Sequence, residues 1–406
     1  MYNIFSMFTN IYNIQKKLLF LSLTLLILSG CLKRPQPQAG DFSGKVVDAY
    51  TQEAVPGVTL DIGGQNTTTD LDGKFSIAVL PPGDYQLILA REWYNSRTFD
   101  VHHIGKQKSL EFPLIPLPLE GKILYSGNRT KNWEIYELDL SNNRSVTQRS
   151  NTTYAEINPI KIANNQIIFQ SDRSGNGDLF LCDIDAINII DKAIPCCSPV
   201  YKDEYPSVDQ TGTKLVFKSG ESDKNGKEEK VICLYNLQSK ELVVIKDGAQ
   251  NITGYNPAIN QAGTKIALVS GNYEKLLLFD VNGMMVTKSK EFDFYASNKL
   301  KINNPCWCPT EDDIAFEAYQ DSDGPRAIYR ISIGSPTASS LKQVSFNQGS
   351  GSEQHKNPCW SKKGMIFFSL RSDIYGVKVI DGSVNNKPLI MVSPGSGDKE
   401  YISWSE

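Results

Sequence analysis

The sequence predicts an all-β protein with two folded parts, a small β-sandwich followed by a six-bladed β-propeller that the C-terminal strand closes. Short apolar runs separated by turn residues fill positions 42–112, and a phrase built on Asn-Pro or Tyr-Pro then recurs at intervals of 47 to 53 residues. The first and last segments of the repeating part each hold only a portion of one repeat. The chain has 406 residues, 40% hydrophobic and 21% charged, which is typical of a folded globular protein.

Residues 1–30 are typical of a secretory signal peptide. Lys16 and Lys17 precede an apolar core at 18–28, which would span about 16 Å as a helix, too short for a hydrocarbon layer of roughly 30 Å. The stretch Leu28-Ser29-Gly30-Cys31 resembles the bacterial lipobox. The resemblance implies cleavage before Cys31 and lipidation of that cysteine, and ordinary signal cleavage near Gly30 is the alternative.

A lipidated Cys31 would anchor the mature chain, because two or more acyl chains suffice for stable membrane attachment. The residue after it is Leu32 rather than the Asp of the inner-membrane retention pattern. The resemblance therefore implies an outer-membrane lipoprotein of the cell envelope that faces the periplasm. Residues 31–41 contain a polar, Pro-rich stretch and are expected to form a flexible tether.

Residues 42–112 are predicted to form the β-sandwich, because short strands follow one another at a spacing of about ten residues. Four spaced motifs resemble the carboxypeptidase regulatory-like domain, and they lie at 44–48, 56–58, 67–75 and 80–85. The resemblance implies a transthyretin-like sandwich without activity, serving as a spacer or docking module and, more weakly, as a carbohydrate-binding one. Asp70 and Asp72 are expected to be turn residues, and His102 and His103 solvated loop residues, rather than metal ligands.

Residues 113–119 are predicted to be a Pro-rich linker between the two domains. Prolines at 113, 116 and 118 lack the backbone N–H group that a sheet requires, and they stiffen the chain. The linker is therefore expected to be short and semi-rigid.

Residues 120–406 are predicted to form the propeller. After each Pro phrase come a polar turn, an apolar strand, a third strand and a weaker fourth one, and four strands in about 48 residues are the unit of a propeller blade. The segment 121–148 supplies strands two to four of a first blade but lacks the opening phrase, whereas 401–405 supplies only that phrase. Joining them completes a sixth blade and removes two exposed strand edges.

The repeat pattern resembles that of TolB-like propellers. Its best copy runs from Ser171 through Arg173 to Phe180, and partial copies contain Arg129 and Arg371. The resemblance implies a periplasmic scaffold that contacts other proteins, including peptidoglycan-associated lipoproteins. These three arginines are candidate binding residues on loops, and their alternative role is to lock strands within a blade.

Charge and composition exclude several classes of function. A formal net charge of −3 provides no basic excess for nucleic acid, and only three histidines occur, which argues against a metal site; no cofactor is expected. Of the seven cysteines besides Cys31, Cys182 could form a disulfide with Cys196 or Cys197, or the cysteines could be buried free thiols.

Three functions fit these observations. The first is a non-enzymatic envelope lipoprotein that binds a protein partner, such as a peptidoglycan-associated or outer-membrane protein. The second is binding of glycans or peptidoglycan, in which Trp93, Tyr94 and Trp133 would stack on sugar rings; core packing is the alternative for these rings. The third is a polysaccharide-cleaving propeller enzyme with two carboxylates in the funnel, although the sequence has no G-x-S-x-G nucleophile motif and supplies no catalytic residue that we can name.

Overall fold

The structure is a computed structural model of the 406-residue chain. It describes residues 13, 15–17, 38–105, 109–190, 192–196, 201–222, 228–310, 312–320, 324–334, 340–346, 353–379, 390–393 and 397–406. The lipidation candidate Cys31 and nearly all of the signal peptide lie outside these residues. No helix in the described part of the chain is long and apolar enough to cross a membrane.

The N-terminal domain is a sandwich of two sheets, as predicted. One sheet has the order β4-β1-β7, and the other has the order β3-β2-β5-β6. Their strands are β1 (Gly40–Asp48), β2 (Thr59–Ile62), β3 (Gln65–Thr68), β4 (Lys74–Leu80), β5 (Gly83–Ala90), β6 (Arg97–His103) and β7 (Leu110–Leu114). Pairing extends beyond the expected bounds at both ends, because β1 begins inside the predicted tether and β7 includes Pro113 of the predicted linker. Proline is tolerated there because β7 is an edge strand.

Alternating side chains of these strands fill the sandwich core, which includes Phe42, Phe75 and Phe112. The expectation that His103 is solvated is wrong. Its position on β6 points inward, its side chain is fully buried, and its ring meets the Phe42 ring edge-on at 5.8 Å. The neighbouring His102 points the other way and pairs with Asp84 at the surface, as the two-residue period of a strand requires.

The propeller consists of six sheets, five with four strands and one with three among the described residues. From the innermost strand outward, blade 1 contains β32 (Lys399–Ser405), β8 (Lys122–Gly127), β9 (Glu134–Asp139) and β10 (Ser145–Gln148), and blade 2 contains β11 (Glu156–Lys161), β12 (Gln166–Ser171) and β13 (Asp178–Asp183). Blade 3 contains β14 (Glu204–Val208), β15 (Lys214–Ser222), β16 (Glu228–Asn236) and β17 (Leu242–Val244), and blade 4 contains β20 (Gly254–Ile259), β21 (Lys265–Ser270), β22 (Lys275–Asn282) and β23 (Met285–Asp293). Blade 5 contains β24 (Lys301–Trp307), β25 (Asp313–Tyr319), β26 (Ala327–Ser332) and β27 (Lys342–Gln343), and blade 6 contains β28 (Lys356–Trp360), β29 (Met365–Leu370), β30 (Asp373–Lys378) and β31 (Ile390–Ser393).

Blade 1 combines both ends of the propeller segment. The C-terminal β32 pairs antiparallel with β8, from Lys399 opposite Gly127 to Ser405 opposite Lys122. The innermost strands contact one another in the order β32, β11, β14, β20, β24 and β28, and β28 contacts β32 again. A 3-10 helix (Ile184–Ala186), a small hairpin of β18 (Lys246–Asp247) and β19 (Gln250–Asn251), and α2 (Phe294–Asn298) complete the described elements of the propeller.

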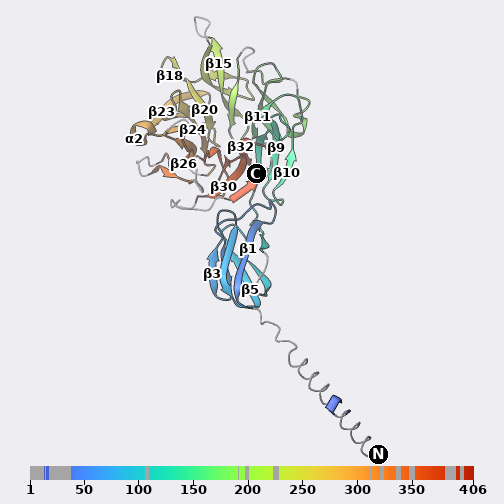
Figure 1. The fold of residues 1–406 in the computed structure, drawn as a ribbon. Coiled ribbons are helices and arrows are strands. Elements are labelled where there is room, and N and C mark those ends of the chain that lie inside the picture. Colours follow the sequence, from blue (N-terminus) through green and yellow to red (C-terminus); the bar gives the residue numbers. More distant parts are fainter. Residues whose placement is uncertain are drawn as a thin grey trace, which may run out of the picture.

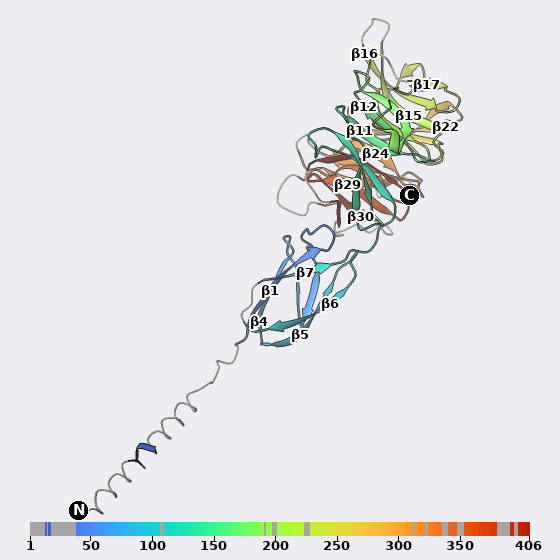
Figure 2. The same ribbon diagram turned by 90° about the vertical axis from the view of Figure 1, so that its right-hand side faces the viewer.

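The sandwich packs against blades 1 and 6 of the propeller (Figures 1 and 2). Arg144, in the turn before β10, donates to Asp48 of the sandwich at 3.1 Å, and both side chains are 3% exposed. Lys378 of β30 lies 4.7 Å from the centre of the Trp93 ring. Trp93 also packs against the hydrophobic cores of both domains, so the two domains share one packed junction.

Candidate functional site: the mouth of the central channel

Four of the six predicted binding residues lie at one end of the propeller. Neighbouring strands of a blade are antiparallel, so the loop between strands two and three lies where the innermost strand begins. Arg129, Trp133, Arg173 and Arg371 all belong to such loops. The other two, Trp93 and Tyr94, lie in the sandwich at the domain junction.

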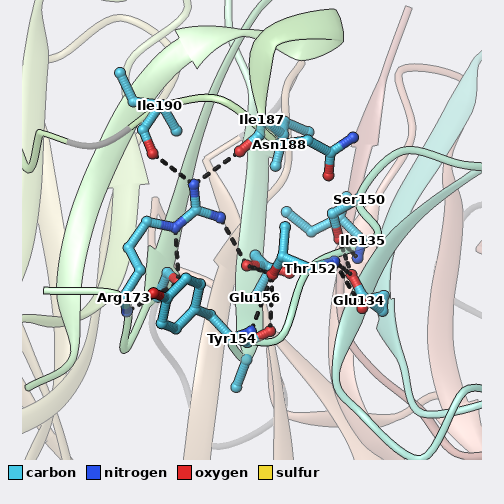
Figure 3. A network of polar contacts seen from close by, with 12 residues as sticks. Glu134, Ile135, Ser150, Thr152, Tyr154, Glu156, Arg173, Ile187, Asn188 and Ile190 are labelled. Atoms are coloured by element: carbon cyan, nitrogen blue, oxygen red, sulfur yellow. Dashed lines mark hydrogen bonds and ion pairs between the residues drawn. The ribbon is translucent and has the colours of Figure 1, made fainter. Parts of the chain in front are cut away.

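The three arginines all contact their own blades. Arg173 is the most enclosed, with a side chain 6% exposed, and it donates to Glu156 at 2.6 Å and to the carbonyls of Ile187 and Ile190, each at 2.8 Å (Figure 3). Arg129 donates to the Tyr125 hydroxyl at 2.7 Å. These contacts fit the strand-locking alternative for both side chains.

Arg371 is more accessible, because its side chain is 60% exposed. It forms an ion pair with the buried Glu353, which also contacts His355. Arg371 therefore retains donor capacity toward solvent while holding one buried carboxylate.

Behind Arg173 lies a buried carboxylate pair, Glu156 and Glu134, which joins blades 1 and 2 (Figure 3). Thr152 donates to Glu156 and Ser150 to Glu134, each at 2.6 Å. Burial raises the pKa of Glu156 to about 7, and the nearby Glu134 acts in the same direction. Both side chains are at most 1% exposed, so their arrangement is that of a structural pair rather than one that a substrate can reach.

The junction residues have little ring surface to offer a ligand. Tyr94 is 8% exposed, and its hydroxyl donates to Asp48 at 2.9 Å. Trp93 is half-buried between the two cores and beneath Lys378. Both rings contribute to the packing that joins the domains.

The innermost strands carry the six repeat phrases, and each phrase forms the same bulge. The first residue of the phrase has a positive φ, between 46° and 55°, in all six blades: Asn158, Tyr205, Asn256, Asn304, Asn357 and Tyr401. The pairing register shifts at the same place in every innermost strand. Asn adopts this backbone readily, whereas Tyr does so rarely, so Tyr205 and Tyr401 are strained positions of the kind found at functional sites.

These six residues surround a central channel of about 250 Å³. On one side of the ring, the asparagines bond to one another across blades. Asn256 donates to Asn303 at 2.6 Å and also to Asn304, and Asn304 donates to Asn357 at 2.7 Å. These bonds therefore link blades 4, 5 and 6 along one side of the channel.

The mouth of the channel carries a group of five tyrosines, which we call the tyrosine cluster: Tyr205, Tyr255, Tyr273, Tyr319 and Tyr401. Tyr255 and Tyr273 stack at 4.7 Å with an interplanar angle of 9°. Burial raises the pKa of Tyr273 to about 12, and the neighbouring Tyr255 adds to this effect. The predicted Trp133 extends the cluster, because its ring meets that of Tyr401 edge-on at 6.5 Å.

Two cations lie over the rings of the cluster. Lys218 Nζ is 4.5 Å from the centre of the Tyr255 ring, and Arg326 is 4.1 Å from that of Tyr319. Each also pairs with a carboxylate, Lys218 with Glu204 at 3.2 Å and Arg326 with Glu317 at 3.3 Å. The side chains of Lys218 and Glu317 are 5% and 2% exposed, so these two support the rings from behind. The accessible surface of the mouth consists of the half-buried rings of the cluster and of Arg326.

The tyrosine cluster was absent from the predicted site, although one signal for it is visible in the sequence. Tyr205 and Tyr401 occupy the repeat position that is Asn in the other four copies. This position lines the channel in all six blades, so tyrosine in only two of them makes the channel wall asymmetric. Tyr255, Tyr273 and Tyr319 come from three different elements, and only the fold brings them together.

Cysteine and histidine do not form a metal centre in the described part of the chain. Cys182, Cys196, Cys233, Cys306, Cys308 and Cys359 are free thiols, so the candidate bridge from Cys182 to Cys196 is not formed, and Cys197 lies outside the described residues. Burial raises the pKa of Cys306 to about 12, which keeps its thiol protonated and unreactive at neutral pH.

Comparison with known proteins agrees with this two-part architecture. Residues 41–114 match the carboxypeptidase regulatory-like domain. TolB from Acinetobacter baumannii is 12% identical, with a TM-score of 0.50, and the alignment covers 80% of each chain. Hydrazine synthase from Kuenenia stuttgartiensis is 10% identical, with a TM-score of 0.51, over 70% of this chain and 47% of that one. No curated protein matches in sequence.

An oligogalacturonate lyase in complex with manganese is also similar, with 14% identity and a TM-score of 0.42 over 63% of this chain and 71% of that one. At these identities the similarity concerns the fold alone. The chain therefore carries an N-terminal carboxypeptidase regulatory-like domain followed by a propeller of the TolB-like fold.

Proposed function

We propose that this protein is a non-enzymatic cell-envelope lipoprotein that binds a partner protein at the mouth of its propeller. The observation that carries the proposal is the tyrosine cluster, with strained Tyr205 and Tyr401 and two cations over its rings. Tyrosine and arginine are enriched at the centres of protein interfaces, where they contribute large contact areas with few rotatable bonds. A rigid ring of strands fixes these side chains before the partner arrives.

The proposed anchor is the lipid on Cys31, which would place the sandwich between the outer membrane and the propeller. In chain order the sandwich lies between Cys31 and the propeller. This order suits a spacer that holds the propeller away from the membrane surface. The proposed partner is a peptidoglycan-associated or outer-membrane protein, since both lie within reach of such an anchor.

Site-specific photocrosslinking in intact cells tests the binding proposal. A photoreactive phenylalanine derivative replaces Tyr255 in one strain and Gln238, an exposed residue in the turn before β17, in a matched control strain. We expect one discrete crosslinked protein from the Tyr255 position and none from the Gln238 position. Equal crosslinking from both positions, or none from either, contradicts a partner site at the mouth. Loss of palmitate labelling in Cys31→Ala tests the anchor separately.

Glycan binding is the second candidate, and the half-buried ring of Trp133 beside Tyr401 favours it. Aromatic rings at a channel mouth provide flat surfaces on which sugar rings stack. Sedimentation of the protein with purified cell-wall fragments tests this alternative. Binding by the wild type that is lost in a folded Trp133→Ala variant would support it, and absence of wild-type binding would exclude it.

A further inference from the structure

A second pocket lies at the domain junction, away from the tyrosine cluster. It has a volume of about 440 Å³, within the range of small-molecule sites. One wall comes from the sandwich and includes Pro56, Leu71 and Arg91; the other comes from blade 6 and includes Asp373 and Tyr375. The pocket therefore exists only because the two domains are docked.

The charges around this pocket are paired except for Arg91 on the cationic side and the exposed Glu53 on the acidic side. Asp48 accepts from Arg144 and from the Tyr94 hydroxyl, at 3.1 and 2.9 Å. Asp373 is paired with Lys399 at 2.7 Å, and Glu353 is paired with Arg371. Arg91 is the cation that remains. Its Nε and Nη1 atoms are shielded from water and have no hydrogen-bond partner, and it forms no ion pair with any described residue.

Arg91 is half-buried, and a guanidinium that is partly shielded from water and has no partner destabilises the folded protein; an anion at its accessible edge reduces that cost. Burial lowers the pKa of Arg91, which reflects the same lack of solvation. The remaining Nη2 atom is not among the shielded ones, so a ligand in the pocket reaches Arg91 there, and a carboxylate fits best because it supplies a charged acceptor to the guanidinium. Leu71, Pro56 and the Tyr375 ring provide apolar surface for the rest of such a ligand.

We propose that the junction pocket binds a small molecule through a carboxylate that pairs with Arg91. The carboxylate could belong to the C-terminal end of a short peptide or to a uronic acid, and both carry the same chemistry. The site is independent of partner binding at the channel mouth. The ligand of this pocket would bind only while the sandwich and the propeller are docked.

The test uses the full chain purified in detergent and measures thermal unfolding and ligand-observed NMR. The probes are acetyl-alanine and galacturonate, each paired with a neutral counterpart, acetyl-alaninamide and galactose. We expect a carboxylate probe to raise the melting temperature while its neutral counterpart does not. The arm that responds identifies the peptide or the uronic acid as the source. Equal shifts from charged and neutral probes, or no shift from either carboxylate, would overturn the proposal.

The decisive variant is Arg91→Met, which keeps the side-chain length and removes the charge. We expect its melting temperature without ligand to equal or exceed that of the wild type, and its carboxylate binding to fall at least about tenfold. Arg97→Met is the control, because Arg97 lies on β6 and donates to the carbonyl of Pro113 at 3.0 Å. It should lower the melting temperature and leave probe binding intact. An Arg91→Met variant that is destabilised or unfolded would show that Arg91 is structural and would overturn the proposal.

Discussion

The domain junction and the channel mouth contain the same kinds of side chain and use them differently. At the junction, the Tyr94 hydroxyl and the Arg144 guanidinium both bond to Asp48, and the Arg144–Asp48 pair is 3% exposed on each side. At the mouth, Tyr255 and Tyr273 stack on each other while remaining half-buried. Complete burial commits a polar side chain to holding the fold, whereas partial exposure leaves a surface for recognition.

This comparison explains why tyrosine, tryptophan and arginine alone do not identify a site. The sequence predicts the same role for Trp93 and Trp133, which is stacking on sugar rings. In the structure Trp93 joins two hydrophobic cores, whereas Trp133 borders the channel mouth. Both rings are half-buried, and what separates them is that Trp93 packs between two domains whereas Trp133 contacts Tyr401 of the propeller.

Arg144→Ala should have the largest effect on stability. It leaves the Asp48 carboxylate buried without its cation, and breaking a buried pair in this way costs about 3–5 kcal/mol. We expect a large fall in the melting temperature and faster proteolysis at residues 115–119 as the domains separate. Lys74→Ala is the matched control, because the Lys74–Asp72 pair is 63% and 73% exposed and should contribute less than about 1 kcal/mol. Similar effects from the two changes would mean that the junction is not held by its ion pair.

Glu156→Gln should have a smaller effect that depends on pH. The folded-state pKa of Glu156 is about 7, above its ordinary value of 4.5, so between these values the folded state binds more protons than the unfolded state. The stability that this site contributes is full below about pH 4.5 and is lost as the pH rises through 7. Gln resembles the protonated form, so the variant should gain on the order of 2 kcal/mol relative to the wild type between pH 5 and pH 8. Melting curves across that range provide the measurement, and a constant difference would contradict the burial argument.

Tyr255→Ala tests the other side of the comparison. Loss of its half-buried ring should weaken pull-down of the partner at least about tenfold, equivalent to about 1.4 kcal/mol, while the melting temperature changes little. Tyr295→Ala is the matched control, because Tyr295 of α2 also lies near a lysine, at 5.0 Å from Lys299, but outside the tyrosine cluster. A Tyr295 effect as large as the Tyr255 effect would place the partner elsewhere.

The sequence contained most of the fold, because the repeat phrase at 158, 205, 256, 304, 357 and 401 specifies the same strand and bulge in every blade. The pairing of β32 with β8 followed from two complementary incomplete repeats. The tyrosine cluster was harder to predict from the sequence. Tyr255, Tyr273 and Tyr319 lie in three different elements, and their proximity depends on the angle between neighbouring blades, which no local pattern encodes. Arg173 matches the repeat motif well because it bonds within its blade, so the strength of the motif reflected structure rather than recognition.

His103→Phe should have the smallest effect and tests whether the sandwich core is purely a packing unit. The ring of His103 is fully buried, both of its nitrogens lack hydrogen-bond partners, and it lies edge-on to Phe42. Replacing a buried polar ring that forms no hydrogen bonds by an apolar ring of similar shape removes a desolvation cost, so we expect stabilisation of up to about 1 kcal/mol, measured by chemical unfolding. Partner crosslinking at Tyr255 should not change, because the substitution lies in the other domain. Destabilisation by His103→Phe would mean that its imidazole nitrogens bind a group within the sandwich, and the sandwich would then join the channel mouth as a region that recognises a ligand.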